Sequence, residues 1–137
     1  MKPIIQEEKT GCAIASSAAI AGVSYFEAKE IANTIGIYAT DPALWSETDP
    51  IRQLLKEFGI ETSNKITPFI SWEALPNIAL LSTKWHLENN KPYWHWAVFV
   101  RDSKQCYVLD SKKSLKTHKR TDFGRIKPKW FIEVKMA

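Results

Sequence analysis

Four side chains in this chain have the chemistry of a cysteine-based nucleophilic site: Gln6, Cys12, His95 and Asp110. Such a set can supply a thiolate nucleophile, its base, a carboxylate that orients the base, and an oxyanion donor. No single member of the set is rare. Their order, their spacing and the segments that contain them together predict one catalytic site.

Cys12 opens an apolar, Ala-rich segment, residues 12–21, which predicts a helix that ends at Gly22. Only the thiolate form of cysteine attacks well, and a helix N-terminus and a nearby imidazolium both stabilise its negative charge. Gly11 allows the backbone or a substrate to approach closely. The backbone N–H of Cys12 and the side-chain amide of Gln6 could form an oxyanion hole, in which one donor is worth roughly 3–4 kcal/mol.

His95 and Asp110 are expected to meet across a hairpin. They lie in two strand-like segments joined by a predicted turn over residues 102–105. If the turn is centred on Ser103-Lys104, Asp110 faces Ala97, and Asp110 shares one face of the sheet with His95. The two become diagonal neighbours, roughly 7–8 Å apart at the backbone, a gap that a carboxylate and an imidazole can span. A one-residue bulge in the turn would put them on opposite faces.

Helix patterns fill the first half of the chain, and strand patterns fill the second. The capping-box pair Ser24 and Glu27 begins a second helix that Gly36 ends, and Asp49-Pro50 begins a third that ends at Gly59. The predicted strands are residues 78–87, 95–101, 106–110 and 130–135, the last as an edge or closing strand, with a turn over 88–92 and loops over 37–48 and 111–128. Helices first and strands afterwards predict an α+β fold.

Composition and charge bound the class of protein. The chain has 137 residues, of which 45% are hydrophobic and six are Trp, so it can bury a core, and we expect a single domain over residues 1–137. Residues 1–100 carry 8 Lys/Arg against 11 Asp/Glu, a net charge of −3, whereas residues 101–137 carry 11 against 4, a net charge of +7. The basic residues do not alternate with aromatics, so we interpret segment 112–129 as a solvated face and expect no nucleic-acid partner.

The sequence predicts a soluble, cytoplasmic protein without cofactors, although export by another route stays open. Pro3 to Glu8 follows Met1 too soon for the apolar region of a signal peptide, and no apolar stretch approaches the roughly 20 residues of a membrane span. Two Cys make no disulfide framework. The three His and two Cys have no zinc-ligand spacing, and no Gly-rich phosphate loop is present, so we expect no metal site.

These motifs resemble the papain-like cysteine peptidase fold, and within it the small bacterial branch that includes the double-glycine leader peptidases of bacteriocin exporters. The elements that carry the resemblance are Gln6, Gly11-Cys12-Ala13-Ile14-Ala15, the strand beginning at His95 and the strand ending at Asp110. It runs from about residue 4 to residue 111 and is weakest between residues 37 and 77. It implies a papain-like α+β domain, with an N-terminal helical half packed on a C-terminal antiparallel sheet and the site in the cleft between them.

The resemblance also implies roles for the four residues. Cys12 becomes the nucleophile, His95 the base and acid, Asp110 the residue that orients His95, and Gln6 the oxyanion donor. The implied chemistry is acyl transfer from a peptide or amide to water through a thioester, on a peptide or protein substrate, without a metal. The chain departs from the leader peptidases, which usually have Asp before the Cys, Gly after it and commonly Pro after the Asp; here these positions are Gly11, Ala13 and Ser111.

Two other functions remain open at this stage. The same thiolate–imidazole pair can deamidate a protein glutamine or transfer the acyl group to an amine, which would release ammonia without chain cleavage. Alternatively, the chain is a non-catalytic domain that binds peptides, or binds anions through residues 112–129. An unreactive Cys12 at neutral pH would favour the binding domain, and strongly salt-dependent binding would indicate an anionic partner.

Each candidate residue also has a structural alternative. A lone Cys is most often a small buried hydrophobe. His95 could pack between Trp94 and Trp96, which flank it and could either join the core or line a pocket. Asp110 could simply bond the following turn. The other titratable candidates are His86, a rival base without a partner in hairpin register, His118, expected to be solvated, and Cys106, expected to be a structural strand residue.

Overall fold

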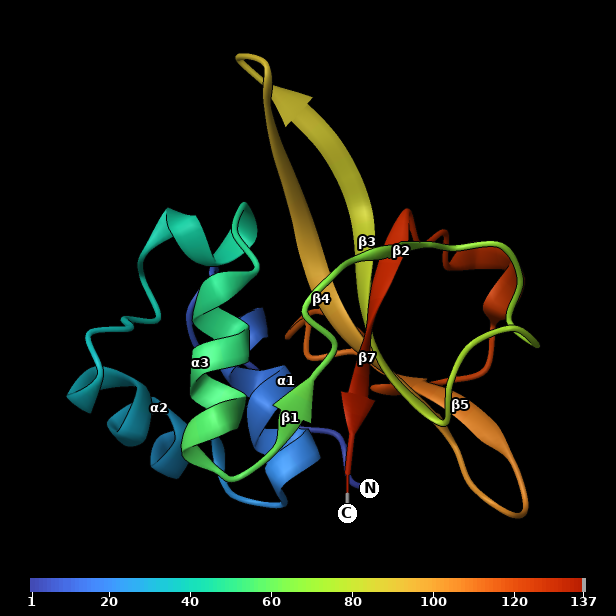
Figure 1. Cartoon of the computed structure of the whole chain (residues 1–137), viewed down its shortest axis with the longest axis horizontal. Helices are drawn as coiled ribbons and strands as arrows, with labels where there is room; N and C mark the ends of the chain where they lie inside the picture. The colour runs from blue at the N-terminus through green and yellow to red at the C-terminus, as the bar shows by residue number, and fades with distance from the viewer. Residues whose placement is uncertain (137) are drawn as a thin grey trace.

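The structure is a computed structural model that describes residues 1–136. The helices come first along the chain and pack to one side of the strands that follow, as the blue-to-green and yellow-to-red segments of Figure 1 show. The predicted order of helices and strands is therefore confirmed. In the described part of the chain, no helix is both long and apolar enough to cross a membrane.

Helix α1 (Cys12–Ala21) lies at the centre of the fold. Its residues from Cys12 to Ile20 are all buried, on every side of the helix, as expected of a helix with neighbours all round. It packs against α2 (Tyr25–Thr34), α3 (Asp49–Glu57) and strand β4. Its small Ala side chains allow these close approaches. The helix ends at Gly22, where φ is +73° and the backbone N–H donates to the carbonyl of Ala18.

The other helices begin close to where the sequence predicts. Ser24 caps α2 by accepting the N–H of Glu27 at 3.1 Å. Helix α3 includes Asp49 as its first residue, so its N-cap is Thr48, one residue earlier than predicted. The segment predicted as a loop before α3 contains a short 3-10 helix, η1 (Pro42–Trp45), whose start is capped by the carboxylate of Asp41.

The sheet is antiparallel, with the strand order β1-β7-β3-β4-β5-β6 and β2 also paired with β7. Its strands are β1 (Glu61–Thr62), β2 (Thr67–Pro68), β3 (Ile78–Glu88), β4 (Lys91–Arg101), β5 (Cys106–Leu109), β6 (Lys119–Arg120) and β7 (Trp130–Lys135). Residues 130–135 form a strand, as predicted, but of the two predicted positions, an edge or a closing strand, the edge position is wrong, because β7 has β3 on one side and β1 and β2 on the other. Strands of two residues are too short to give an alternating pattern, so the sequence did not predict them.

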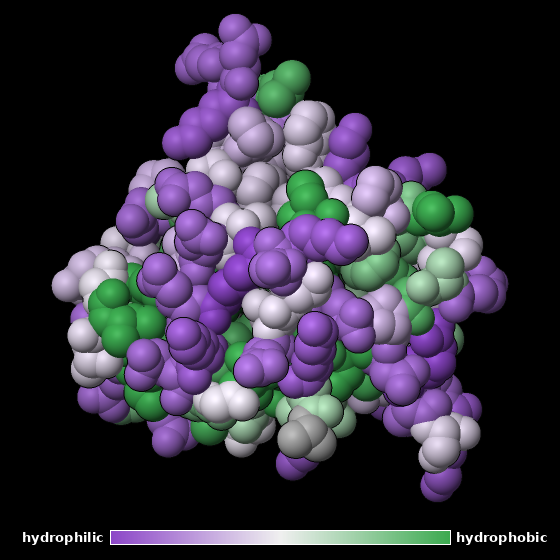
Figure 2. Space-filling view, in the orientation of Figure 1, coloured by the Kyte–Doolittle hydropathy of each residue, from purple (hydrophilic) through white to green (hydrophobic). Residues whose placement is uncertain are grey.

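Strands β3 and β4 form an arm that extends beyond the rest of the sheet, toward the top of Figure 1. The turn at its tip is only Asn89-Asn90, both with positive φ, so the strands are longer than predicted and Pro92 lies in β4. The tip is mostly hydrophilic in Figure 2. A bulge between Thr83 and His86 interrupts the pairing where the arm leaves the sheet.

The β4–β5 hairpin has the predicted register. Val98 faces Leu109, and Arg101 faces Cys106, which is the register of a hairpin whose turn is centred on Ser103-Lys104. The carboxylate of Asp102 fixes the turn by accepting the N–H groups of Lys104 at 2.8 Å and Gln105 at 2.9 Å. Because β5 pairs with β4 only from Val98 onward, no strand within residues 1–136 pairs with that side of β4 before Val98.

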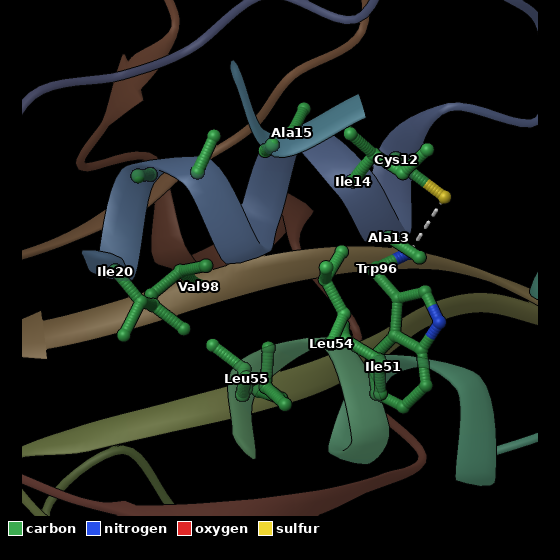
Figure 3. Packing of buried hydrophobic residues seen from close by; sticks show 14 of the residues in the cluster. Cys12, Ala13, Ile14, Ala15, Ile20, Ile51, Leu54, Leu55, Trp96 and Val98 are labelled. Carbon is green, nitrogen blue, oxygen red and sulfur yellow. Dashed lines mark hydrogen bonds between the residues drawn. The ribbon is translucent and has the colours of Figure 1, made fainter. Parts of the chain in front are cut away.

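Buried side chains lie on both faces of the sheet. Alternate residues of β4, including Trp96 and Val98, pack with α1 and α3 in the larger cluster, part of which Figure 3 shows. The other alternate residues of β4, which include Phe99, point to the opposite face of the sheet and pack with Val108 in a smaller cluster. The larger cluster is therefore the layer that fixes α1 against β4.

Candidate active site

Cys12 lies where the N-terminus of α1 meets the free edge of β4. Its Sγ accepts the backbone N–H of Trp96 at 3.5 Å, the dashed line in Figure 3. This N–H is available because β5 does not reach so far along β4. The indole of Trp96 donates to the carbonyl of Leu44 in η1 at 3.1 Å, which ties this part of β4 to the helical half. Cys12 itself is 0% exposed.

His95 and Asp110 are joined as the hairpin register predicts. His95 Nε2 lies 2.8 Å from Asp110 Oδ1, and the two side chains are 13% and 3% exposed. Burial by itself lowers the pKa of His95, but hydrogen bonds to Asp110 and Cys12, and the charges of both, outweigh it and raise the pKa to about 9. Burial likewise raises the pKa of Asp110, but the hydrogen bond and charge of His95 hold it well below the usual range. At neutral pH His95 is thus an imidazolium whose Nε2–H donates to the carboxylate.

Gln6 is brought to the site by the residue after Asp110. Its backbone N–H donates to the Ser111 carbonyl at 3.0 Å, and its Oε1 accepts the Ser111 hydroxyl at 2.7 Å. Its Nε2 donates to the carbonyls of Glu8 and Lys9, both at 3.0 Å. Gln6 is buried, and its amide donors are engaged within its own loop.

The loop before Cys12 is anchored to α2. The Glu8 carboxylate accepts the Tyr25 hydroxyl and forms an ion pair with Lys29. Gly11 passes directly beneath Tyr25, so that a Cβ at position 11 would clash with the hydroxyl oxygen. Gly11 has an ordinary negative φ, so packing against Tyr25 and not backbone freedom requires glycine here.

Arg120 is a site residue that the sequence analysis missed. Its Nη1 donates to Asp110 Oδ2 at 3.0 Å, while its Nε and Nη2 donate to the two carboxylate oxygens of Asp122 at 2.9 and 2.8 Å. Asp110 Oδ1 also accepts the backbone N–H of Lys112 at 3.1 Å. Both oxygens of Asp110 therefore have partners, and Arg120 fixes the oxygen that His95 does not use. Arg120 lies in a segment predicted as a loop. Its spacing from Asp122 is the one sequence feature that indicates an ion pair there.

Replacing Arg120 with Met is expected to lower the free energy of unfolding by about 1.5–3 kcal/mol. The substitution keeps the apolar stem but leaves one oxygen of the buried Asp110 carboxylate without its charged donor. Arg120 is 17% exposed, so the interaction is only partly screened by solvent. Urea denaturation at pH 7 measures the change, with the exposed Arg125→Met as the control variant; equal unfolding midpoints for the two variants would contradict this role.

A groove of about 430 Å³ runs beside His95 along the free edge of β4. His95 lines it and contacts Cys12, whereas Cys12 is fully buried behind this wall. The lining residues are Gln6, Glu7, Glu8, Lys9, Trp45, Lys84, His86, Tyr93, Trp94, His95, Lys112, Lys113 and Ser114.

The remaining candidates lie apart from the Cys12–His95 pair. His86 is exposed on the arm, where its Nδ1 lies 2.8 Å from the Lys84 carbonyl and its Nε2 3.5 Å from Glu88. His118 contacts the Lys112 carbonyl at 3.0 Å, and Cys106 is half-buried at the start of β5. Within residues 1–136, no three or more His, Cys, Asp or Glu side chains gather in a group that could hold a metal.

Comparison with known proteins gives one likeness, and it is a likeness of fold. No family model matches the chain, and no curated protein matches it. The structure is similar to that of a double glycine motif protease from an AMS/PCAT transporter, solved in complex with the leader peptide. The similarity has a TM-score of 0.59 at 16% sequence identity, and it covers 99% of this chain and 91% of that chain. The chain thus has the predicted α+β fold, consistent with a papain-like peptidase and shared with a double glycine motif protease.

Proposed function

We propose that this chain is a thiol-dependent peptidase or amide hydrolase that acts on a peptide or protein, with Cys12 as its nucleophile. One observation carries the proposal: a histidine with a pKa raised to about 9 joins a buried carboxylate at 2.8 Å and contacts the cysteine that begins the central helix. A structural histidine does not need both of these neighbours. The shared fold with a double glycine motif protease supports the same conclusion.

In the proposed reaction, the Cys12 thiolate attacks the carbonyl carbon of the scissile amide. As the C–N bond breaks, His95 gives its proton to the leaving amine, and the acyl group remains on Cys12 as a thioester. His95 then removes a proton from water, which attacks the thioester and releases the acid and the thiolate. Asp110 stays charged throughout and stabilises each imidazolium that forms.

The oxyanion would be stabilised by the backbone N–H of Cys12 and by Gln6. The first N–H groups of a helix have no acceptor within the helix, so they can bind developing negative charge. The Gln6 amide would have to exchange the carbonyls of Glu8 and Lys9 for the oxyanion. Since Cys12 is buried, a substrate can reach it only if the residues that cover it move. Movement of the loop over residues 6–9 would both release the Gln6 amide and expose Cys12.

The groove favours an extended peptide as the substrate. It passes residues 93–95 of β4, where β3 pairs with one side of the strand and, within residues 1–136, β5 does not reach the other side, so an added strand could pair there. Trp45 and Trp94 in the wall offer apolar contact to its side chains. The structural neighbour was solved with a leader peptide, which agrees with a peptide ligand for this fold.

The pH dependence of Cys12 alkylation by iodoacetamide tests the proposal without a known substrate. With Cys106 replaced by Ser, labelling is expected to be rapid at about pH 6–7, because His95 is protonated there and stabilises the thiolate. In His95→Ala the rate at pH 7 is expected to fall at least about tenfold. His86→Ala is the control, since His86 lines the groove without bonding to the thiol. Slow labelling that rises only near pH ~8.5 and ignores His95 would overturn the proposal.

A further inference from the structure

Two lysines flank the His95–Asp110 pair in the wall of the groove. Lys84 follows Thr83, the residue of β3 that faces His95 across the β3–β4 pairing. Lys112 comes two residues after Asp110, and its backbone N–H donates to the same Asp110 oxygen that His95 contacts. One lysine therefore approaches the pair from β3 and the other from the loop after β5.

The two lysines line the same groove, and neither has a carboxylate partner of its own within residues 1–136. The presence of Lys112, together with burial, lowers the pKa of Lys84, because a second positive charge disfavours its charged form. Asp110 is the carboxylate nearby, but its oxygens are held by His95 and Arg120. Across residues 1–136, neither lysine forms an ion pair. Two cations that line one groove attract an anion to it.

The backbone holds Lys84 in an unusual conformation. Its φ is +52°, in the left-handed region, at the bulge that interrupts the β3–β4 pairing between Thr83 and His86. A lysine gains nothing locally from this conformation, which favours glycine and asparagine. Bulges often redirect a side chain next to a functional site, and strain of this kind clusters at such sites. The bulge lies where Lys84 lines the groove opposite the loop that carries Lys112.

We propose that Lys84 and Lys112 form an anion subsite that binds a carboxylate on the leaving-group side of the peptide. The inference rests on the proposed peptidase function. Cys12 retains the acyl part of the substrate, whereas His95 gives its proton to the leaving amine, so the leaving segment lies on the His95 side of the groove. Both lysines are on that side. The carboxylate is either an acidic side chain or the free C-terminus of the substrate, because the chemistry of recognition is the same.

Two alkylating probes that differ in charge test the subsite. The ratio of the alkylation rate with iodoacetate to that with iodoacetamide is measured at Cys12, with Cys106 in the same protein as the internal reference thiol. In Lys84→Gln/Lys112→Gln this ratio is expected to fall about three- to tenfold at Cys12 in low salt, because two positive charges near the probe are lost. The iodoacetamide rate itself should change little, and the ratio at Cys106 should stay constant.

The matched control is Lys56→Gln/Lys135→Gln, which removes two exposed lysines from outside the groove. An unchanged ratio in the Lys84/Lys112 variant, with rapid iodoacetamide labelling retained, would overturn the subsite and leave the peptidase proposal intact. Wild-type iodoacetamide labelling that rises only near pH ~8.5 and does not depend on His95 would overturn the peptidase proposal instead. The two failures are therefore distinguishable.

Protection of Cys12 from iodoacetamide identifies the source of the carboxylate. Three probes are compared: N-acetyl-tetraalanine with a free C-terminus, its C-terminal amide, and an amidated analogue with one Asp. Protection by the free acid alone supports a terminal carboxylate, and protection by the Asp analogue alone supports an acidic side chain. If neither anionic peptide protects more than the neutral amide, the assignment to a peptide carboxylate is wrong.

Discussion

Replacement of Cys12 with Ala is expected to lower kcat/KM for peptide hydrolysis by on the order of 10⁴-fold or more. The Cys12 sulfur is the protein atom that bonds to the carbonyl carbon of the substrate in the proposed reaction, so its removal stops the covalent route. What remains would be the contribution of binding and of the oxyanion donors. Hydrolysis of a peptide library, followed by mass spectrometry, measures the loss.

The fold is expected to survive the change, because Cys12 is fully buried as a small side chain, and Ala fits the start of an Ala-rich helix. Far-UV circular dichroism and the Tm confirm that the variant is folded. Cys106→Ala is the matched control, since Cys106 is the other free thiol and lies half-buried in β5. If Cys12→Ala kept wild-type activity, or if Cys106→Ala removed it, Cys12 would not be the nucleophile.

The meeting of His95 and Asp110 could be predicted because it depends on local rules. The Asp102-Ser103-Lys104-Gln105 turn sets the register, and the alternation of side chains then decides which residues share a face. Likewise, Gly22 and the Ser24–Glu27 cap mark helix ends through interactions between near neighbours. In each case the cause lies within a few residues of its effect.

The parts that sequence analysis missed depend on contacts between distant segments. Arg120 reaches Asp110 only because β6 pairs with β5, and a strand of two residues leaves no periodic pattern to detect. The central position of β7 depends on its pairing with β1, β2 and β3. The clash that requires Gly11 comes from Tyr25 on the next helix.

Gln6 is buried next to Ser111, with which it makes two hydrogen bonds. Its role as the oxyanion donor stays a prediction. Its amide N–H groups donate to the carbonyls of Glu8 and Lys9, contacts that no sequence pattern reveals. Ser111 also has a physical role at the position where leader peptidases commonly have Pro: its hydroxyl binds Gln6, a contact that proline cannot make.

Replacement of Asp110 with Asn is expected to lower activity strongly, although less than loss of the thiol or of His95. The hydrogen bond and charge of Asp110 help raise the pKa of His95 to about 9. Without that charge, burial is opposed only by Cys12, and we expect the pKa of His95 to fall back toward its ordinary value. His95 is then less protonated at pH 7–8, so it stabilises the thiolate and protonates the leaving amine less well. An Asp-to-Asn change in a Ser-His-Asp triad lowers kcat by about 10⁴-fold, and a loss of roughly 10²–10⁴-fold is expected here.

Replacement of Asp110 with Asn is also expected to change how the stability of the protein varies with pH. Because the pKa of His95 is raised in the folded protein, its stabilising effect is complete below about pH 6.5 and is lost as the pH rises toward 9. The wild type should therefore lose stability over this range, and Asp110→Asn should not. Urea unfolding between pH 6 and 9, with an NMR titration of His95, measures both effects. Asp122→Asn is the control, because Asp122 shares Arg120 with Asp110 but does not contact His95. An unchanged His95 titration in Asp110→Asn would mean that Asp110 does not set the charge of His95, and the proposed catalytic pair would lose its physical basis.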